Sequence, residues 1–319
     1  MSNIIELDGD IWQVDLMERG IPGRTAGFFV KGEDNNWLLI ETGPASSLNI
    51  LLDTAELLNI TNKNLKHIAV THIHIDHAGG LGSLTSKFTN ATVWVHPKGK
   101  KHMINPSRLI EGAIAVHGVE KFNQYGDVLP VSEDRISIAN EGTKIFLGER
   151  ILEIWEMIGH AKHHVCFFDH KTKGLFSGDA VGLYAPSLSR ELNYPVMRPA
   201  TPSPDFNGKL MMQDLYRLAQ SDISKVHFSH FGTSTLPQLI VDIMVGKLWF
   251  CLEVAKKNIN EEYPYKKIQE LLQERSEKEL FHHLTSSDKK NEIIGVELEY
   301  IMDFSNTTKG ILNYLKSNV

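Results

Sequence analysis

Short runs of apolar and β-branched residues, separated by Gly, Pro, Asn and Asp, recur through the first 230 residues of the chain. Runs of this length and composition are typical of β-strands. The Asp34-Asn35-Asn36 run between two of them predicts a hairpin turn. Strands are predicted at Ile11–Leu16, Gly27–Lys31, Trp37–Glu41, His67–Thr71, Thr92–His96, Lys144–Leu147, Ile151–Ile158, His164–Asp169, Gly174–Ser177 and Lys225–Ser229.

Helical spacing of apolar residues appears once early in the chain and dominates its last third. Ser47–Leu58 repeats apolar residues every three or four positions, which predicts an amphipathic helix. After His230 the β-formers become fewer and the helical period takes over. Further helices are predicted at Pro237–Ile259, Tyr265–Leu284, Asn291–Asp303 and Thr307–Ser317, with Thr307 as the N-cap of the last.

This change of pattern predicts a mixed α/β domain over residues 1–232 and a helical C-terminal extension over residues 233–319 that packs on it. The α/β part has two β-rich halves, each with its own helices. Such halves are compatible with two packed sheets flanked by helices, although the pattern alone does not establish that arrangement.

Composition narrows the class of protein. A length of 319 residues suits one large domain with an extension, and 23% charged residues is ordinary for a soluble protein. The net charge of −6 argues against a nucleic-acid partner, but a local basic patch stays possible. The only two cysteines, Cys166 and Cys251, exclude a disulfide framework and a multi-cysteine metal site.

The beginning of the chain has no basic segment followed by an apolar one, and no uncharged apolar run reaches the length of a membrane span. We therefore expect a cytoplasmic protein with no membrane partner and a small-molecule substrate. A homodimer is compatible with the sequence.

The run His72-Ile73-His74-Ile75-Asp76-His77 places four potential metal ligands at the end of a predicted strand. In an extended segment, side chains two residues apart point the same way, so His72 and His74 can reach one metal together. Where the chain turns into a helix, Asp76 and His77 point in another direction and can bind a second metal. The two glycines that follow permit the tight turn.

Three further predicted strands are followed at once by a potential ligand. A single His or Asp at such a place usually caps a helix or lies in a solvated loop, so one instance indicates little. Four strand ends that all supply hard or borderline ligands favour a shared metal site. The further ligands are His160 after Ile151–Ile158, Asp179 after Gly174–Ser177 and His230 after Lys225–Ser229.

From about residue 10 to residue 232 the sequence resembles the metallo-β-lactamase superfamily. Its His-x-His-x-Asp-His motif matches residues 72–77, and its Gly-His-x-x-Gly-His motif resembles Gly159-His160-Ala161-Lys162-His163-His164. Its Gly-Asp motif matches Gly178-Asp179, and its last histidine matches His230. The resemblance implies an α/β fold of the αββα sandwich type, with the site at one edge of the two sheets.

The resemblance also implies the roles of the ligands. His163 stands where the family commonly has glycine, which either changes the turn or adds an imidazole near the site, and His164 matches a position that is usually structural. The implied ligands are His72, His74 and His160 for one metal, Asp76, His77 and His230 for the other, and Asp179 as the bridge.

The implied cofactors are two divalent metal ions. Nitrogen and oxygen donors suit Zn²⁺, Mn²⁺, Fe²⁺ or Co²⁺. Zinc is the expected ion because the donors are mostly imidazoles and the superfamily commonly uses it.

Four residues are candidates for chemistry or substrate contacts. By resemblance, Asp76 orients the nucleophile or accepts its proton. Tyr184 is the second predicted catalytic residue, because some lactonases of the superfamily place a tyrosine nearby to hydrogen-bond a substrate carbonyl, although a packing role is equally open. His117 lies between the first two metal motifs and could line the substrate pocket. Arg198, in a proline-rich loop, could meet an anionic substrate.

These observations favour a binuclear metal-dependent hydrolase of a small-molecule ester, thioester or lactone, which uses a metal-activated hydroxide. The helical extension resembles those that cover the active site in glyoxalase II-like members. A phosphodiesterase or nuclease of the RNase Z-like branch, an iron-dependent persulfide dioxygenase-like oxidoreductase and a non-catalytic binding module stay open. β-Lactam hydrolysis is not expected, because a superfamily name does not carry an activity.

Overall fold

The computed structural model describes residues 4–281 and 292–318. The chain divides into two compact units, which are described separately below. The first unit comprises residues 1–156, 163–178 and 229–231, and the second comprises residues 157–162, 179–228 and 232–319.

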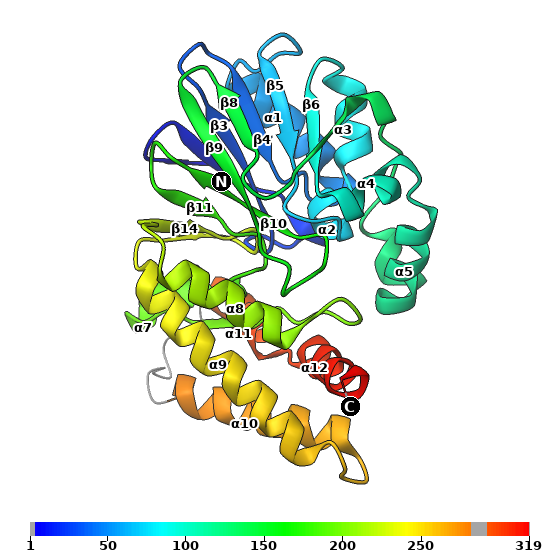
Figure 1. The fold of residues 1–319 in the computed structure, drawn as a ribbon, viewed down its shortest axis with the longest axis vertical. Coiled ribbons are helices and arrows are strands. Elements are labelled where there is room, and N and C mark those ends of the chain that lie inside the picture. Colours follow the sequence, from blue (N-terminus) through cyan, green and yellow to red (C-terminus); the bar gives the residue numbers. More distant parts are fainter. Residues whose placement is uncertain (1–3, 282–291, 319) are drawn as a thin grey trace. The chain divides into compact units, whose positions relative to one another are not determined.

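A seven-stranded mixed sheet forms the centre of the first unit (Figure 1). Neighbours in the sheet follow the chain order, and the pairing is antiparallel from β1 to β4 and parallel from β4 to β7. The parallel strands therefore end at one common edge of the sheet. The strands are β1 (Ile4–Leu7), β2 (Ile11–Asp15), β3 (Ala26–Lys31), β4 (Trp37–Ile40), β5 (Leu65–Ala69), β6 (Thr92–Val95) and β7 (Ile136–Ile138).

Four antiparallel strands of the first unit belong to a second sheet, namely β8 (Lys144–Leu147), β9 (Arg150–Glu156), β10 (Val165–Asp169) and β11 (Gly174–Phe176). One face of this sheet packs against the first sheet through a shared apolar cluster. Within that cluster the rings of Phe28 and Phe176, one from each sheet, meet edge to face at 5.2 Å. The expected packing of two sheets is therefore confirmed.

Helices cover the other face of the seven-stranded sheet (Figure 1). Leu51, Leu84 and Met103, from three of these helices, are buried in one cluster with Leu39 and Ile68 of the sheet. The helices of the first unit are α1 (Leu48–Leu57), α2 (Ile75–Ala78), α3 (Leu81–Lys87), α4 (Pro97–Ile104), α5 (Ser107–His117) and α6 (Val119–Asn123), with 3-10 turns at Glu18–Gly20, Ala45–Ser47 and Glu133–Arg135.

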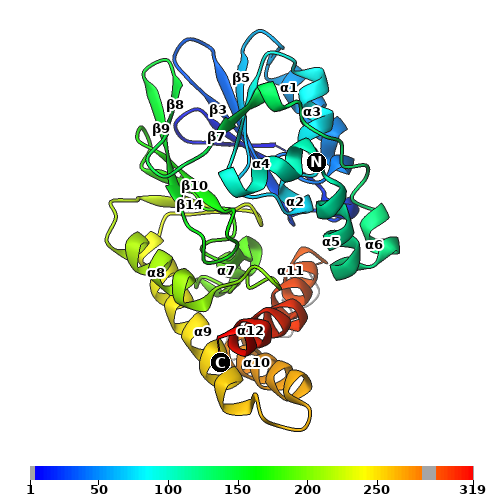
Figure 2. The same cartoon turned by 45° about the vertical axis from the view of Figure 1, so that its right-hand side comes forward.

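The second unit is mainly helical. Its long helix α9 (Pro237–Asn258) buries residues at helical spacing, such as Met244, Leu248 and Cys251, and packs against α8, α10 and α12 (Figure 2). The other elements are the two-stranded pairs β12 (Leu183–Tyr184) with β13 (Met197–Arg198) and β14 (Lys225–His227) with β15 (Thr233–Ser234), and the helices α7 (Pro186–Leu192), α8 (Gly208–Ala219), α10 (Pro264–Phe281), α11 (Glu292–Met302) and α12 (Ser305–Ser317).

Each predicted strand is present, with ends that differ by no more than two residues, and the predicted hairpin turn joins β3 to β4. The predicted helices are confirmed as α1, α9, α10, α11 and α12, although residues 282–284 and 291 of the predictions lie outside the described residues. The N-cap prediction for Thr307 was wrong. Helix α12 begins at Ser305, whose N–H is accepted by the Asp303 carboxylate, and Thr307 lies inside the helix.

The two compact units each consist of several chain segments that alternate along the sequence. Neither unit therefore corresponds to one side of the predicted division at residue 232. Residues 179–228 group with the later helices because α8 packs against α9. The division into a catalytic domain over residues 1–232 and a helical extension over residues 233–319 stays a prediction. Within residues 4–281 and 292–318, no helix is both long and apolar enough to cross a membrane.

A fully buried ion pair within the second sheet uses an arginine that also bonds to the first sheet. Arg150 donates to both carboxylate oxygens of Asp169 at 3.1 and 2.6 Å, and neither side chain is exposed. The remaining guanidinium nitrogen donates to the backbone carbonyls of Gly9 and Lys31, beside the first sheet, at 2.7 and 2.8 Å. Removing one member of a buried ion pair is strongly destabilising, because the charge of the other member is then buried without compensation.

We therefore expect Arg150→Met to lower the free energy of unfolding by about 3–5 kcal/mol in urea titrations, because the Asp169 carboxylate stays buried without its cation. Lys171→Met is the matched control, since its 3.0 Å pair with Asp10 is 41% and 50% exposed. That loss should stay below about 1 kcal/mol. Equal losses in the two variants would contradict the role given to the buried pair.

Candidate metal centre

The order of the strands in the first unit determines where its candidate ligands lie. Parallel strands β4 and β5 are neighbours, so Glu41, just after β4, and His72, just after β5, come to the same edge of the sheet. In the second sheet β9 and β11 both run antiparallel to β10, so both end beside its start. His163 and Gly178 therefore lie at a common edge of that sheet.

The run from His72 to His77 has the predicted geometry. His72 and His74 lie in extended chain after β5, and His74 has φ −60° and ψ 150° directly before α2. Asp76 and His77 lie within α2 itself, so they point in a different direction. Gly79 is needed here, because a Cβ at this position would stand 2.3 Å from the carbonyl oxygen of Ile75.

Several histidines have Nδ1 engaged, and their Nε2 atoms face other candidate ligands. His230 Nδ1 donates to the backbone carbonyl of Arg24 at 3.1 Å. The Nε2 atoms of His77 and His230 each lie 3.7 Å from Oδ2 of Asp76. His72 directs Nε2 at Nδ1 of His74, 2.9 Å away. Hydrogen bonds to the outer ring nitrogen are the usual device that fixes the tautomer of metal-binding histidines.

Glu41 is the buried carboxylate behind two of these rings. It is 1% exposed, and its Oε1 accepts hydrogen bonds from Thr71 and, at 2.9 Å, from Ser229. Because the Thr71 hydroxyl donates to Glu41, its oxygen accepts from Nδ1 of His72 at 3.0 Å. His77 places Nδ1 3.4 Å from the same Oε1. Glu41 therefore holds His72, through Thr71, and His77 directly.

Glu41 also adopts a backbone conformation that few side chains tolerate. Its φ of 67° is left-handed, which for a residue other than glycine costs on the order of 1–3 kcal/mol. Such conformations persist where the surrounding structure requires them, and here the turn after β4 directs the carboxylate into the site.

The second unit repeats the same ring arrangement. His160 Nδ1 donates to the carbonyl of Ala200 at 2.9 Å, and its Nε2 lies 3.4 Å from Oδ2 of Asp179. In the chain order, residues 157–162 lie between two segments of the first unit, and Asp179 follows Gly178, the last residue of the second of these segments.

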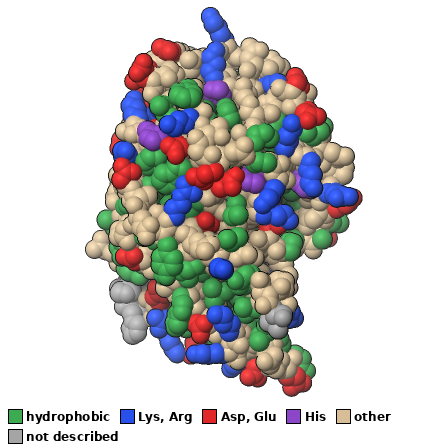
Figure 3. Space-filling view, viewed as in Figure 1, with side chains coloured by type: hydrophobic (Ala, Val, Ile, Leu, Met, Phe, Trp, Pro, Cys, Tyr) green, Lys and Arg blue, Asp and Glu red, His purple; other side chains and the backbone are tan. Residues whose placement is uncertain are grey.

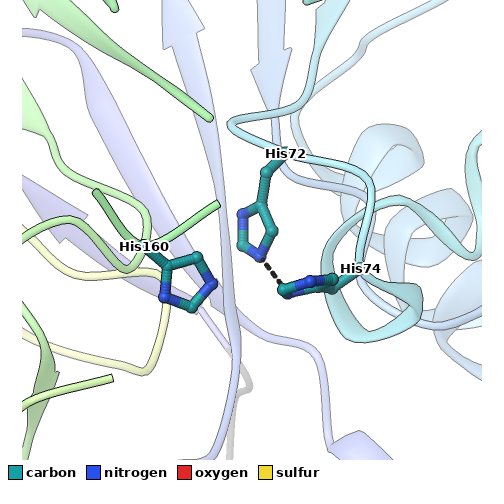
Figure 4. A group of neighbouring side chains, drawn as sticks. All are labelled: His72, His74 and His160. Carbon is teal, nitrogen blue, oxygen red and sulfur yellow. Dashed lines mark hydrogen bonds between the residues drawn. The ribbon is translucent and has the colours of Figure 1, made fainter. Parts of the chain in front are cut away.

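The ligand atoms fall into groups in which all atoms lie within 4.8 Å of one another, and Figure 4 shows the imidazole group around His72. Donors bound tetrahedrally to one ion at about 2.0–2.2 Å stand roughly 3.4 Å apart, close to the separations of 3.4 and 3.7 Å above. The donor set and its spacing therefore suit a divalent transition metal. The groups are His72, His74 and His160; Asp76, His77 and His230; His72, His77 and Asp179; and His74, His163 and Asp205.

His163 and His164, which the sequence analysis did not count among the ligands, both lie near this centre. The ring of His163 stacks parallel to that of His72 at 6.1 Å, so it adds an imidazole close to the ligands. His164 is fully buried, and a Cβ on Gly178 would stand 2.4 Å from its Nε2. Gly178 is therefore needed to accommodate this ring.

The three candidate substrate residues have different surroundings. Tyr184 is buried, its ring stacks on Phe228 at 4.7 Å, and burial raises the pKa of its hydroxyl. Arg198 is buried in the second unit. His117 ends α5, where burial lowers the pKa of the imidazole and the Asp76 carboxylate opposes that shift.

Other histidines make ordinary structural contacts. His67 accepts from the indole of Trp94 at 3.2 Å, and His96 caps α4 by accepting from the backbone N–H of Lys98. His170 contacts the Glu153 carboxylate at 2.9 Å. These contacts account for the three rings without a metal.

Residues 20–230 of the chain match the family described as "Metallo-beta-lactamase superfamily". The chain belongs to this superfamily. The matched residues include the candidate ligands in the order that the motifs predicted, and the αββα fold class is confirmed together with the helical C-terminal part.

Individual relatives of the superfamily cover different shares of the chain. A "Hydroxyacylglutathione hydrolase" of Bdellovibrio bacteriovorus is 25% identical over 46% of this chain and 49% of its own length. An "Acyl-coenzyme A thioesterase MBLAC2" of Gallus gallus is 28% identical over 58% of this chain and 64% of its own length. The matched segments thus span between about half and two thirds of these relatives.

One solved structure extends the similarity of fold over nearly the whole chain. The archaeal metallo-beta-lactamase superfamily protein ST1585 of Sulfolobus tokodaii aligns with a TM-score of 0.60 and 22% identity, over 93% of this chain and 94% of its own. At this identity the likeness shows the fold alone.

Two residues of the centre were missed by sequence reasoning. Glu41 resembles any acidic turn residue after a strand, and the only signal was its place before Thr42-Gly43 at a strand end. Asp205 carried no signal, since it lies in a loop rich in Pro and Ser and pairs with Lys162 at 3.0 Å.

The contacts of Glu41 predict its effect on metal affinity. Glu41→Gln should weaken Zn²⁺ binding about 10- to 100-fold in competition with a chromophoric chelator, because the neutral amide no longer fixes the two imidazoles as strongly. Glu153→Gln is the control, because it alters another Glu–His contact, the 2.9 Å pair with His170. Unchanged affinity in Glu41→Gln would rule out the orienting role.

Proposed function

We propose that this chain is a binuclear metal-dependent hydrolase that cleaves small-molecule thioesters. The observation that carries the proposal is the convergence of imidazole and carboxylate atoms whose outer nitrogens are already held by the protein. The proposed ligands are His72, His74 and His160 for one ion, Asp76, His77 and His230 for the other, and Asp179 between them, since Asp179 groups with one histidine from each set.

Two divalent cations, when bound, would supply a water whose pKa is lowered toward neutrality and would polarise a substrate carbonyl. Zinc is the proposed ion because most donors are imidazoles, and Mn²⁺ or Fe²⁺ also suit them. The protein's part is to hold each donor in place, since His77 and His230 are buried with Nδ1 directed at an acceptor.

Asp76 is the proposed proton acceptor for the attacking water. Its side chain is 24% exposed, whereas those of His77 and His230 are 1% and 6% exposed, so it is the most accessible member of its group. His117 is proposed to bind a polar group of the substrate. Its imidazole interacts electrostatically with the Asp76 carboxylate, and its ring lies 5.5 Å from that of Tyr125.

A catalytic role for Tyr184 is also proposed, namely a hydrogen bond from its hydroxyl to the substrate carbonyl. The hydroxyl of this buried side chain would have to reach the substrate carbonyl. The stacking of the ring on Phe228 favours its present position.

Thioesters are placed first among the possible acyl substrates because two relatives carry names of that chemistry, hydroxyacylglutathione hydrolase and acyl-coenzyme A thioesterase. A small-molecule substrate also agrees with the charge distribution. On the face shown in Figure 3, Lys and Arg side chains alternate with Asp and Glu rather than forming one continuous basic area.

We expect the Zn²⁺-loaded protein to hydrolyse acyl-coenzyme A and acylglutathione thioesters faster than p-nitrophenyl acetate or a simple lactone. Removal of the metal with a chelator should abolish turnover, and added Zn²⁺ should restore it, because the nucleophile depends on the ions. Free thiol release is the readout. Turnover of bis-p-nitrophenyl phosphate alone, or oxygen consumption with a thiol persulfide, would transfer the assignment to a phosphodiesterase or an oxidoreductase.

Asp76→Asn should lower kcat about 10²- to 10⁴-fold on the best thioester, the range expected when a general base is lost. Metal content must be measured in the same sample, because Asp76 is also a proposed ligand. Asp53→Asn, an exposed acidic position in α1, should leave kcat unchanged. Full activity in metal-loaded Asp76→Asn would remove this residue from the mechanism.

A further inference from the structure

The second unit contains a cavity of about 490 Å³ that is lined by none of the candidate metal ligands. Its walls come from α9 and α10, from the loop around Tyr194 to Pro199, and from Phe304 before α12. Small-molecule pockets in proteins typically measure about 300–1,000 Å³. The cavity therefore has the size of a ligand site, and all of its walls belong to one unit.

Arg198 lines this cavity and is 6% exposed. Within the described part of the chain its guanidinium donates only to neutral acceptors, the Thr307 hydroxyl at 2.8 Å and the carbonyl of Tyr300 at 3.3 Å. Its Cζ also lies over the rings of Tyr300 and Phe304, at 5.6 and 5.9 Å. These contacts satisfy its hydrogen bonds but bring no negative charge into direct contact with it.

A buried cation without a paired anion is costly, and proteins usually compensate it with a carboxylate. Burial lowers the pKa of Arg198, and electrostatic interactions with Tyr300, Asp303 and Asp179 oppose this shift without a direct ion pair. A carboxylate brought by a ligand would supply the missing partner through charge-assisted hydrogen bonds.

The other walls of the cavity add apolar surface and no net charge, so the excess of one positive charge in the lining is Arg198 itself. Lys247 is already paired with Glu279 at 2.8 Å, and Arg275 lies over the ring of Phe250 at 5.7 Å. The lining holds three cationic and two acidic side chains, together with apolar residues such as Trp249 and Leu272. A ligand with an anionic head and an apolar body matches this composition.

Gly246 is an exposed glycine in the wall of this cavity. It lies in the middle of the 22-residue helix α9, where glycine costs about 1 kcal/mol relative to alanine. A Cβ at this position would meet nothing within 4 Å, so close packing does not require glycine there. Gly246 lines the cavity, and its missing side chain leaves that wall clear.

We propose that this cavity binds a small amphipathic anion, a carboxylate joined to an apolar chain, with the carboxylate on Arg198. None of the candidate metal ligands lines this cavity, and the proposal does not rest on the proposed hydrolase activity.

Isothermal titration calorimetry with sodium decanoate tests this directly, because it reads binding without turnover. Decanoate should bind at least about tenfold more tightly than 1-decanol, which lacks the charge, and more tightly than inorganic phosphate, which lacks the apolar chain. Equal binding of decanoate and 1-decanol would overturn the role of Arg198. Failure of decanoate to bind at all would overturn the proposal.

Two variants connect the binding to this cavity. Gly246→Phe should abolish decanoate binding by filling the space, without a clash at its Cβ. Gly295→Phe is its control, since Gly295 is also a helical glycine, exposed, with nothing within 4 Å of a Cβ, and it should bind normally. Arg198→Gln, which keeps hydrogen-bond donors, should weaken binding about tenfold or more.

Thermal unfolding of each variant establishes that it is folded before titration. If decanoate binds folded Gly246→Phe as tightly as the unchanged protein, the ligand occupies another place and the cavity is not the site. Since Gly246→Phe does not alter Arg198, the proposal stays falsifiable even if Arg198→Gln fails to fold.

Discussion

The buried carboxylate of Glu41 joins three segments that are distant in the chain. It contacts Thr71 after β5, His77 in α2 and Ser229 just before His230. A carboxylate that is 1% exposed is tolerable only when donors surround it, so this requirement fixes the three segments together. The same contacts orient His72 and His77, and the geometry of the candidate ligands in the first unit depends on them.

Local pattern was enough to predict the candidate ligands, because the His72–His77 run and the other candidates follow strands that the sequence already indicated. It could not find Glu41, whose function depends on the parallel pairing of β4 with β5, since this pairing brings positions 41 and 71 together. It also could not foresee that Arg198 is buried against residues 300–307, because those partners lie a hundred positions later. Long-range contacts of this kind leave no local signal in a single sequence.

The family match and the second cavity occupy different parts of the chain. The match covers residues 20–230, which hold the whole candidate metal centre. Most of the cavity wall lies beyond residue 230, in α9, α10 and Phe304, and only the loop from Tyr194 to Pro199 comes from the matched part. Chemistry shared by a superfamily and recognition particular to one chain are often separated in this way, because a fold carries its function in local sites.

The interleaving of the two units bears on how the protein is made. The chain passes between the units five times, at residues 156, 162, 178, 228 and 231. On the ribosome, where domains generally fold in order from the N-terminus, the first unit cannot finish until its last segment, residues 229–231, has been synthesised. His230 lies in that segment, so a nascent chain that already carries the His72–His77 run still lacks one ligand. The candidate group of Asp76, His77 and His230 is therefore complete only at a late stage of synthesis.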